Sequence, residues 1–388
     1  MRILSIHNRY QIRGGEDESR ESEERLLREN GHQVDVYEES NDRLREMSKI
    51  NAVTRTIWSD ESYKEVTWRL RQERYDVVHV QNFFPLISPA VHYAAKQQGV
   101  AVVQTLRNYR LLCPNALFFR NGQICEDCLD KWIPYPGIIH NCYRENKAAS
   151  TATAAMITAH RALGTWSKAV DRFITLTEFA RSKFIQGGFP PEKILVKPNF
   201  VNPDPGLGEG KGAYALYVGR LSVEKGLDTL LQAWEKLEHP YPLKIIGDGP
   251  LSKRVEELTR NVSNIEWLGR KPLPEVHKIM GDASFLVFPS KWYETFGRVA
   301  VEAFSRGTPV VAAKIGAIAE LIKHGKTGLL FVPGDSEDLA QQINWCLSNP
   351  SELALMRQRA RREFEAKFTA KANYVRIMDI YAQVLGQA

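Results

Sequence analysis

Residues 1–37, MRILSIHNRYQIRGGEDESRESEERLLRENGHQVDVY, determine the fold class of this chain. The apolar run at 1–7 predicts a short strand, and a polar loop leads from it into a charged amphipathic helix expected at 16–30. Gly31 ends that helix, and the alternating residues 33–37 predict a second strand. A strand, a helix and a strand in this order open a parallel α/β sheet.

The same pattern continues through the first half of the chain and restarts after a linker. Further strands are expected at 76–80, 100–105 and 172–177. Residues 201–212 contain two prolines and four glycines, a composition typical of a linker. Beyond it, strands are expected at 214–218, 243–246, 265–268, 285–289 and 309–313, and helices at 227–237, 251–259 and 296–306.

A length of 388 residues exceeds what one hydrophobic core usually organises, which favours two domains. We expect an N-terminal domain at 1–196, with a cysteine-containing insert near 107–146, followed by a linker at 197–212. The second domain is expected at 213–368. Apolar residues at helical spacing in 369–388 predict a last helix that returns to the first domain.

Composition places the chain among ordinary globular proteins, with 43% hydrophobic and 25% charged residues. The formal net charge of +6 is compatible with an anionic ligand, an anionic membrane surface or simple solubility. No charged leader followed by an apolar stretch precedes the first strand, and no apolar run is long enough to span a membrane. We therefore expect a cytoplasmic protein.

Two cations stand in the loop that follows the expected strand 214–218. Arg220 offers a fork that fits phosphate oxygens, and Lys225 offers a compact point charge. A turn between them can aim both side chains at one anion. The alternative is a basic loop that is simply solvated.

A second polar segment, Ser290-Lys291-Trp292-Tyr293-Glu294-Thr295-Phe296-Gly297-Arg298, leads from a strand into a helix. The N–H groups of such a helix start can hold a phosphate. Glu302 follows Glu294 by eight residues, so the two carboxylates would lie at most about 12 Å apart if that span were helical. They could bind a sugar and a ribose of one ligand, or they could only compensate the helix dipole.

The loop from Arg220 to Lys225 and the glutamates Glu294 and Glu302 resemble those of glycosyltransferase family 4. The resemblance extends over nearly the whole chain. It includes Arg13-Gly14-Gly15-Glu16-Asp17, Ile246-Gly247-Asp248-Gly249-Pro250 and residues 316–320.

This resemblance implies an α/β fold of the GT-B type, in which two Rossmann-like parallel-sheet domains face a central cleft. It implies retaining transfer of a hexose-type sugar from a nucleotide-diphosphate sugar bound by the second domain, while the first domain receives the acceptor. Arg220 and Lys225 would hold the donor diphosphate, Glu294 the transferred sugar and Glu302 the ribose. Phe296, Gly297 and Gly15 would complete the donor-binding residues, although Gly15 could also be an ordinary turn glycine.

Breaking the anomeric bond leaves negative charge on a diphosphate, which cations and a helix N-terminus stabilise. The sequence contains no Asp-x-Asp triplet, which fits a metal-independent reaction without a catalytic cofactor. A glycan or lipid-linked acceptor in cell-envelope or exopolysaccharide synthesis is expected, with peripheral contact at the inner face of the cytoplasmic membrane and no nucleic acid partner.

One departure from the family concerns the strand 100–105. A histidine that faces the donor sugar often follows this strand in the family, but Arg107 stands at that place here. His79 could face the cleft, although a hydrogen-bonded core histidine is the default expectation.

The insert contains Cys113, Cys125, Cys128 and Cys142, and His140 lies beside them. One C-x-x-C pair with two flanking thiols is compatible with a structural zinc ion, and reduced, partly buried thiols are the alternative. The apolar and basic stretch 115–120 could meet a lipid-linked acceptor or form the core of the insert.

The motifs also bear on three rival classes of function. A nucleotide-sugar epimerase or a phosphorylase could share the fold, but the paired glutamates disfavour it. A dinucleotide-dependent oxidoreductase is rejected because Gly247-Asp248-Gly249 lacks the third glycine of the fingerprint. A basic, zinc-containing nucleic-acid-binding protein is the alternative outside enzymes, and it predicts steeply salt-dependent binding.

Overall fold

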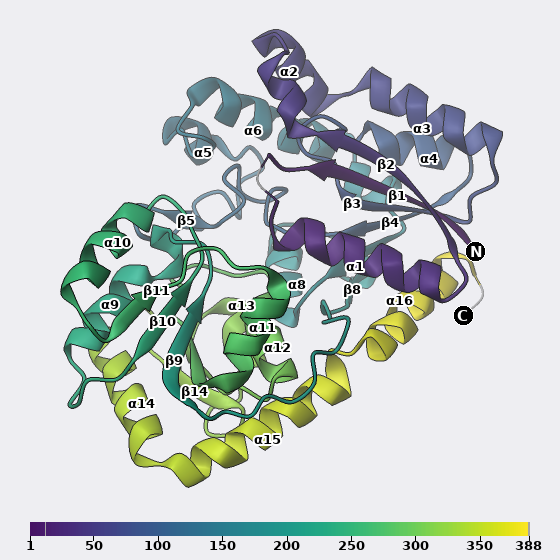
Figure 1. Cartoon of the computed structure of the whole chain (residues 1–388). Helices are drawn as coiled ribbons and strands as arrows, with labels where there is room; N and C mark the ends of the chain where they lie inside the picture. Colours follow the sequence, from purple (N-terminus) through teal and green to yellow (C-terminus); the bar gives the residue numbers. More distant parts are fainter. Residues whose placement is uncertain (12, 387–388) are drawn as a thin grey trace. The chain divides into compact units, whose positions relative to one another are not determined.

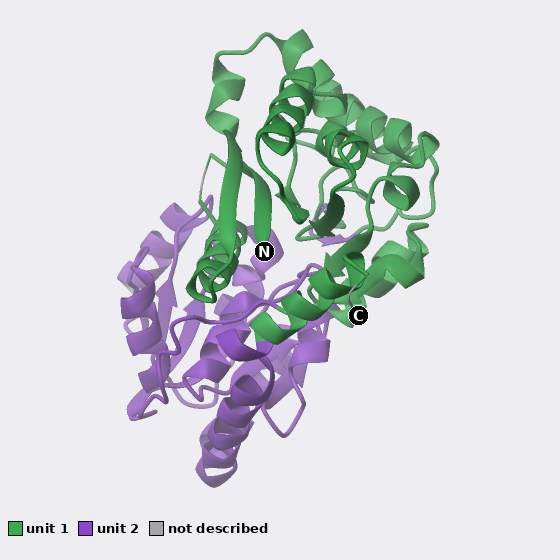
Figure 2. Ribbon diagram, turned by 90° about the vertical axis from the view of Figure 1, so that its right-hand side faces the viewer, with its two compact units in different colours: residues 1–118, 125–198, 373–388 green, residues 119–124, 199–372 purple. Residues whose placement is uncertain are grey.

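The computed structural model describes residues 1–11 and 13–386 and divides the chain into two compact units. The first unit comprises residues 1–118, 125–198 and 373–388, and the second comprises 119–124 and 199–372 (Figure 2). Each unit contains one parallel sheet of six strands, and residues 119–124 add a two-stranded antiparallel hairpin (Figure 1). The predicted α/β class with two parallel-sheet domains is therefore confirmed.

The sheet of the first unit has the strand order β2-β1-β3-β4-β7-β8, and every neighbouring pair is parallel. Its strands are β1 (Arg2–Arg9), β2 (Gln33–Ser40), β3 (Val77–Asn82), β4 (Ala101–Thr105), β7 (Arg172–Thr175) and β8 (Ile194–Val196). Its helices include α1 (Gly15–Glu29), α2 (Lys49–Ile57), α3 (Asp60–Gln72), α4 (Ala90–Gln97), α5 (Tyr135–Ile139), α6 (Lys147–Ala162), α7 (Thr165–Lys168), α8 (Glu178–Gln186) and α16 (Ala370–Val384).

The opening strand and helix form as their sequence predicts. The interior of β1 is buried throughout, as is usual for a strand of a parallel sheet that is covered on both faces. Helix α1 begins at Gly15. Gly31, which follows the C-cap residue Asn30, has a φ of 80°, the left-handed conformation that favours glycine. The polar positions of α1 are not all solvated, because Glu23 and Glu24 are buried.

The last helix packs in the first unit, as predicted. Ile377, Ile380 and Tyr381 of α16 share a buried core with Ile3 of β1 and Leu27 of α1. In Figure 1, α1 and α16 lie on one side of the sheet and α3 and α4 on the other. The first strand and the last helix of the chain therefore contribute to the same core.

The sheet of the second unit has the strand order β11-β10-β9-β12-β13-β14, again with parallel neighbours. Its strands are β9 (Gly212–Val218), β10 (Leu243–Ile246), β11 (Ile265–Trp267), β12 (Ala283–Phe288), β13 (Val310–Ala313) and β14 (Gly328–Phe331). Its helices are α9 (Leu227–Glu235), α10 (Ser252–Asn261), α11 (Leu273–Asp282), α12 (Arg298–Ser305), α13 (Gly316–Leu321), α14 (Ser336–Ser348) and α15 (Pro350–Lys367).

The glycine- and proline-rich segment before β9 is held by arginines of its own unit. Arg306 Nη1 donates to the carbonyl of Gly206 at 2.8 Å, and Arg361 pairs with Asp204 at 2.7 Å. A flexible-linker composition thus becomes a fixed path, because side chains distant in sequence bond its backbone and its carboxylate.

A buried ion pair joins α1 to the segment that leaves β8. Lys197 Nζ lies 2.5 Å from Glu23 Oε2, and the two side chains are 1% and 2% exposed. Lys197 also donates to Asn373 at 3.2 Å, and Gln81 donates to the second oxygen of Glu23 at 2.7 Å. Burial opposes ionisation of Glu23, but Lys197 and its neighbours lower the pKa of this carboxyl to about 2.

Replacing Lys197 with methionine should destabilise the first unit, because Glu23 would remain buried without its cation. The expected loss in the free energy of unfolding is about 3–5 kcal/mol, the usual cost of removing one partner of a buried pair. Urea denaturation followed by circular dichroism measures it. Lys211→Met is the matched control, since that lysine side chain is 81% exposed and its loss should cost less than about 0.5 kcal/mol. Equal losses in both variants would contradict the assignment.

Acidification should weaken the fold through Glu23. Its folded-state pKa is about 2 against an ordinary value of 4.5, so the unfolded chain takes up this proton first as the pH falls. The contribution of ionised Glu23 to the free energy of unfolding is present above about pH 4.5 and is lost as the pH falls towards about 2. Denaturation curves measured across this pH window give the free energy of unfolding. This free energy should fall less steeply with acidification for Glu23→Gln than for the wild type. An unchanged slope would count against the low pKa.

Candidate functional site

The loop after β9 is built by a buried tyrosine and a left-handed glycine. Tyr217 is 3% exposed, and its hydroxyl donates to the carbonyl of Arg220 at 2.9 Å. Gly226 has a φ of 72°, and a Cβ there would come within 1.8 Å of the Pro289 carbonyl oxygen. Only glycine therefore lets this loop pack against the end of β12.

A second glycine loop supports the first. Gly247 and Gly249 follow β10 with φ values of 137° and 158°, and a Cβ at Gly247 would meet the Gly219 carbonyl oxygen at 1.9 Å. Leu221 N donates to the carbonyl of Asp248 at 2.9 Å. The motif that did not match a dinucleotide fingerprint is therefore the support on which the Arg220 loop rests.

Lys225 and Glu294 form the central contact of the site. Lys225 Nζ lies 2.6 Å from Glu294 Oε1, and the same oxygen accepts hydrogen bonds from Ser290 Oγ at 2.8 Å and Trp292 Nε1 at 3.0 Å. The ammonium of Lys225 also lies 5.2 Å from the centre of the Trp292 ring. The carboxylate is buried and fixed in position, while the lysine remains partly exposed.

Arg220 is the exposed cation of the loop. Its backbone carbonyl is tied to Tyr217, but its guanidinium makes no hydrogen bond or ion pair with any residue that the structure describes. Five N–H donors are therefore available to a ligand. An anion bound beside Lys225 would find a second cation on the same loop.

Glu302 lies on α12, and Gly297 is the N-cap residue directly before this helix. Gly297 has a φ of 90°, and a Cβ there would lie 2.2 Å from Ile318 Cδ1. Glu302 is 4% exposed, and Arg298 Nε donates to its Oε1 at 2.8 Å. An unpaired charge would be costly at this buried position, and Arg298 supplies the partner of the Glu302 carboxylate.

The assumed helical span between the two glutamates is wrong. Helix α12 begins at Arg298, so Glu294 precedes it in an irregular turn. The positive φ of Gly297 separates the turn from the helix, and the 1.5 Å rise per residue does not apply across it. Phe296 is a buried anchor of this turn, with its ring 6.1 Å from that of Phe368.

The second unit thus brings together Arg220, Lys225, Glu294, Phe296, Gly297 and Glu302 on the segments that follow β9 and β12. These neighbouring parallel strands end at the same edge of the sheet, the usual place for a ligand in an open α/β sheet. Cations beside a fixed carboxylate can bind a phosphate and an adjoining polyhydroxyl group. Gly15 belongs to the first unit, where it opens α1.

Three residues that position this site were not predicted from the sequence. They are Tyr217, which holds the Arg220 carbonyl, and Ser290 and Trp292, which bond Glu294. The segment Ser290–Arg298 was singled out for its glutamate, and a serine and a tryptophan near a buried carboxylate are the signal that could have identified both donors.

His79 is a hydrogen-bonded core histidine, as expected by default. Its ring nitrogens bond Tyr381 and Thr105 at 2.8 Å each, and burial lowers its pKa to about 4. Arg107 is also buried, at 7% exposure, and its Nη2 donates to Gln81 Oε1 at 2.6 Å.

The predicted structural zinc at Cys113, Cys125, Cys128 and Cys142 is not supported. Among residues 1–11 and 13–386, no group of three or more His, Cys, Asp or Glu side chains is arranged to hold a metal ion. Burial, with the other three thiols nearby, raises the pKa of Cys128 to about 12, which favours the neutral thiol. None of the four forms a disulfide in the described part of the chain, and Cys113 and Cys128 are buried, in agreement with the alternative of reduced thiols.

The stretch 115–120 contributes to the core of the insert. Ala116 and Phe118 are buried, and the Phe118 ring lies 4.9 Å from that of Tyr109.

None of the helices in the described part of the chain is long and apolar enough to cross a membrane.

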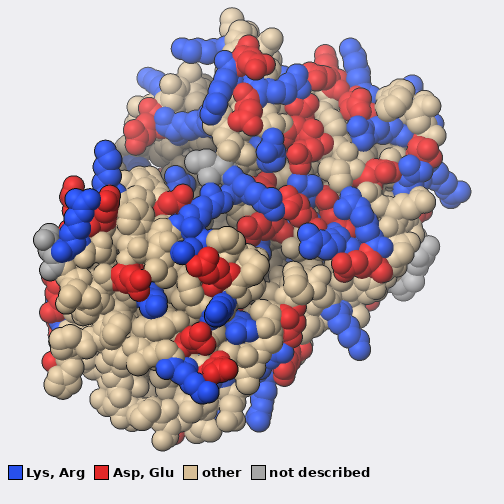
Figure 3. All heavy atoms as spheres, in the orientation of Figure 1, with Lys and Arg blue, Asp and Glu red and all other residues tan. Residues whose placement is uncertain are grey.

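The face of the molecule seen in Figure 3 gives no support to the nucleic-acid-binding alternative. On the face seen in Figure 3, Lys and Arg side chains lie among Asp and Glu side chains over much of the surface. A nucleic-acid interface usually carries a basic patch or stripe on one face.

Two families of known proteins match this chain. The family model described as glycosyltransferase family 4 matches residues 24–205, and the model described as glycosyl transferases group 1 matches residues 203–363. Together the two matches extend from residue 24 to residue 363 and include parts of both units.

Individual relatives agree with the family models. An uncharacterized glycosyltransferase of Methanocaldococcus jannaschii is 32% identical over 216 residues, which cover 55% of this chain and 60% of that protein. The chain thus spans about three fifths of that relative. Spore coat protein SA of Bacillus subtilis is 24% identical over 367 residues, or 90% of each chain.

Among solved structures, the Anabaena protein HepE in complex with UDP aligns with a TM-score of 0.70 at 18% identity. The alignment covers 99% of this chain and 100% of the other, and at this identity it concerns the fold. Two matching family models and this shared architecture lead to one conclusion: the chain belongs to the family 4 glycosyltransferases, which have the GT-B fold.

Proposed function

We propose that this chain transfers a hexose-type sugar from a nucleotide-diphosphate sugar to a glycan or a lipid-linked acceptor. The observation that carries the proposal is the 2.6 Å contact between Lys225 Nζ and Glu294 Oε1. It places a cation suited to phosphate beside a carboxylate suited to sugar hydroxyls. A nucleotide sugar contains both groups side by side, because its diphosphate is bonded directly to its sugar.

The leaving group explains the need for two cations. Cleavage of the anomeric bond leaves negative charge on the diphosphate, and charge is best stabilised by groups that are already in place. The Lys225 ammonium has three N–H donors, so it can hold Glu294 and a phosphate oxygen at once. Arg220 adds a guanidinium with no other partner among the described residues.

The remaining roles follow the family resemblance. Glu294 accepts hydrogen bonds from the transferred sugar, and Glu302 accepts them from the ribose. Phe296 and Gly297 shape the turn between these carboxylates, and Gly15 lets the first loop approach the donor phosphates. The reaction retains the anomeric configuration, and the two cations take the part that a metal ion plays in other transferases.

The donor and the acceptor are proposed from relatives. HepE was crystallised with UDP and with UDP-glucose, which makes UDP-glucose the first donor to test. A spore coat protein among the relatives supports a role in cell-envelope or exopolysaccharide synthesis. We place the reaction in the cytoplasm, with peripheral contact at the inner face of the membrane.

An epimerase or a phosphorylase would use the same donor class but give other products. Incubation with UDP-glucose and analysis of the products by ¹H NMR separates these activities. A transferase gives free UDP and a glycoside, and the coupling constant of the new anomeric proton reports whether its configuration is retained. Conversion of the sugar within an intact nucleotide sugar would overturn the proposal.

Arg220→Ala and Lys225→Ala should each weaken the binding of UDP. Each variant removes a charge-assisted hydrogen bond to a phosphate oxygen, which corresponds to an affinity loss of about 10- to 100-fold. Isothermal titration calorimetry measures the Kd. Lys253→Ala is the matched control, because this exposed lysine lies on α10 of the same unit. Unchanged affinity in both loop variants would contradict their role.

Glu294→Gln and Glu302→Gln should differ in which ligand they affect. Glu294 faces the sugar, so its variant should bind UDP-glucose at least about tenfold more weakly and UDP nearly as well as the wild type. Glu302 faces the ribose, which both ligands contain, so its variant should lose affinity for both. The same calorimetric titrations decide between them, and equal losses for the two ligands in Glu294→Gln would exclude a sugar contact. Thermal unfolding of each variant controls for its fold.

A further inference from the structure

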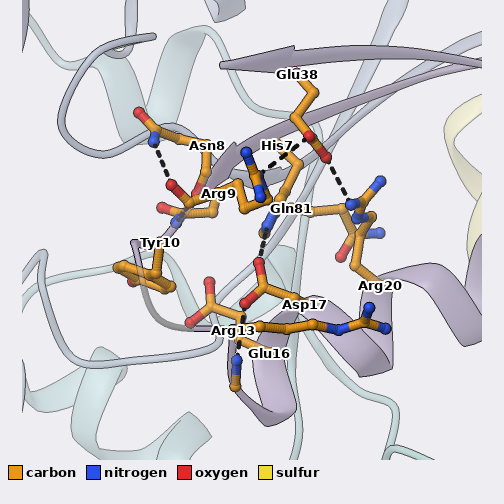
Figure 4. A network of polar contacts seen from close by, with 12 residues as sticks. His7, Asn8, Arg9, Tyr10, Arg13, Glu16, Asp17, Arg20, Glu38 and Gln81 are labelled. Carbon is orange, nitrogen blue, oxygen red and sulfur yellow. Dashed lines mark hydrogen bonds and ion pairs between the residues drawn. The ribbon is translucent and has the colours of Figure 1, made fainter. Parts of the chain in front are cut away.

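The carboxyl edge of the first unit's sheet carries another group of polar side chains. The chain passes from β1 to β2 on one side and then to β3 on the other, so the strand order reverses between β1 and β3. Open parallel sheets bind their ligands at such a reversal. Figure 4 places His7, Tyr10, Glu16 and Asp17 around the end of β1 and the start of α1.

Two neighbouring carboxylates of α1 differ in their surroundings here. Asp17 uses both oxygens, because Oδ1 lies 2.8 Å from His7 Nε2 and Oδ2 accepts from Gly14 N at 3.0 Å. Burial opposes its ionisation, but these hydrogen bonds hold the pKa of Asp17 below its ordinary value. Asp17 thus accepts from the backbone of the N-cap residue of α1, and both of its oxygens are satisfied.

Glu16 lacks such partners. Its Oε1 is buried and has no hydrogen bond among the described residues, and its Oε2 has only Asn108 Nδ2 at 3.5 Å. Burial raises the pKa of Glu16, although the nearby His7 and Arg107 oppose the rise. A buried carboxylate oxygen without a donor is costly, so a fold that keeps one has a use for it.

Other buried polar atoms without a partner in the described part of the chain lie in the same neighbourhood, one on His7 and one on Arg110. His7 is 0% exposed, and its Nδ1 has no partner among the described residues. The Nε of Arg110 is also unpaired, and its guanidinium stacks 4.5 Å from the ring centres of both Phe84 and Tyr143.

Tyr10 is affected by the charges of both Glu16 and Arg110. Burial and the charge of Glu16 raise the pKa of its phenol, while the charge of Arg110 opposes the rise. Asn108 Nδ2 lies 3.3 Å from the Tyr10 hydroxyl and 3.5 Å from Glu16. The acceptor Glu16 and the donors of Asn108 and Arg110 thus lie close together near Tyr10.

The charges select the class of ligand. A metal cation would meet Arg107 and Arg110, and an anion would meet the carboxylates of Glu16 and Asp17. A neutral hydroxyl group, which both donates and accepts, suits unpaired atoms of both kinds. Sugars and other polyols carry such groups on adjacent carbons.

We propose that Glu16 accepts a hydrogen bond from a hydroxyl group of the sugar acceptor at this edge of the first unit. The proposal rests on the proposed transfer reaction and names a residue that selects its acceptor. Arg110 and Asn108 donate to the oxygens of the same acceptor. Glu16 is thus a specificity residue of the first unit, separate from the donor-binding glutamates of the second.

Methyl glycosides test this site on the whole chain. The α- and β-methyl glycosides of glucose, galactose, mannose and N-acetylglucosamine are titrated and followed by saturation-transfer difference NMR. At least one should bind the wild type, and Glu16→Gln should weaken its binding about tenfold. Glu29→Gln is the matched control, because Glu29 is exposed at the end of the same helix. That variant should bind like the wild type.

Stability separates a binding role from a structural one. Glu16→Gln removes a charge whose buried Oε1 has no donor in the described part of the chain, so the Tm of the variant should equal or exceed that of the wild type. A lowered Tm would indicate that Glu16 supports the fold. The proposal is overturned if none of the glycosides binds the wild type, or if Glu16→Gln binds them as tightly.

The donor side is measured in parallel with UDP-glucose. Its affinity should be the same in Glu16→Gln and in the wild type. Binding of a glycoside without binding of any nucleotide sugar would refute the proposed transfer and leave the hydroxyl site standing. Binding of UDP-glucose without any glycoside would refute the site alone.

Discussion

Parallel strand pairing is the constraint on which the rest of this structure depends. Because all neighbouring strands in each six-stranded sheet run in the same direction, their carboxyl ends meet at one edge. Residues far apart in sequence then become neighbours, as Lys225 after β9 and Glu294 after β12 do. The same geometry brings Glu16 near Asn108 in the first unit.

Backbone shape at these edges depends on residues without side chains. Gly226, Gly247 and Gly297 each lie where a Cβ would meet another group at 2.2 Å or less. The contacts are with Pro289, Gly219 and Ile318, which belong to segments distant in sequence. The glycines therefore fix the donor loops through close packing, and the ionic groups of the site are carried on a backbone that has little room to move.

Buried charges serve two different ends in the first unit. Glu23 is paired with Lys197 and bonded by Gln81, so its charge is compensated and joins α1 to the end of β8. Glu16 lies about two turns away on the same face of α1, with an oxygen that no described residue satisfies. Compensated charge holds the unit together, while uncompensated charge marks the place where an outside group can bind.

The sequence by itself determined the two α/β halves, the return of the last helix, and the segments that carry Arg220, Lys225, Glu294 and Glu302, because hydrophobic period and loop composition are local properties. It did not determine the turn before α12 or the absence of a metal-holding arrangement among the described cysteines. Nor did it reveal that Tyr217, Ser290 and Trp292 hold the site. Those features depend on contacts between segments that only the folded chain brings together, so the tertiary structure alone decided them.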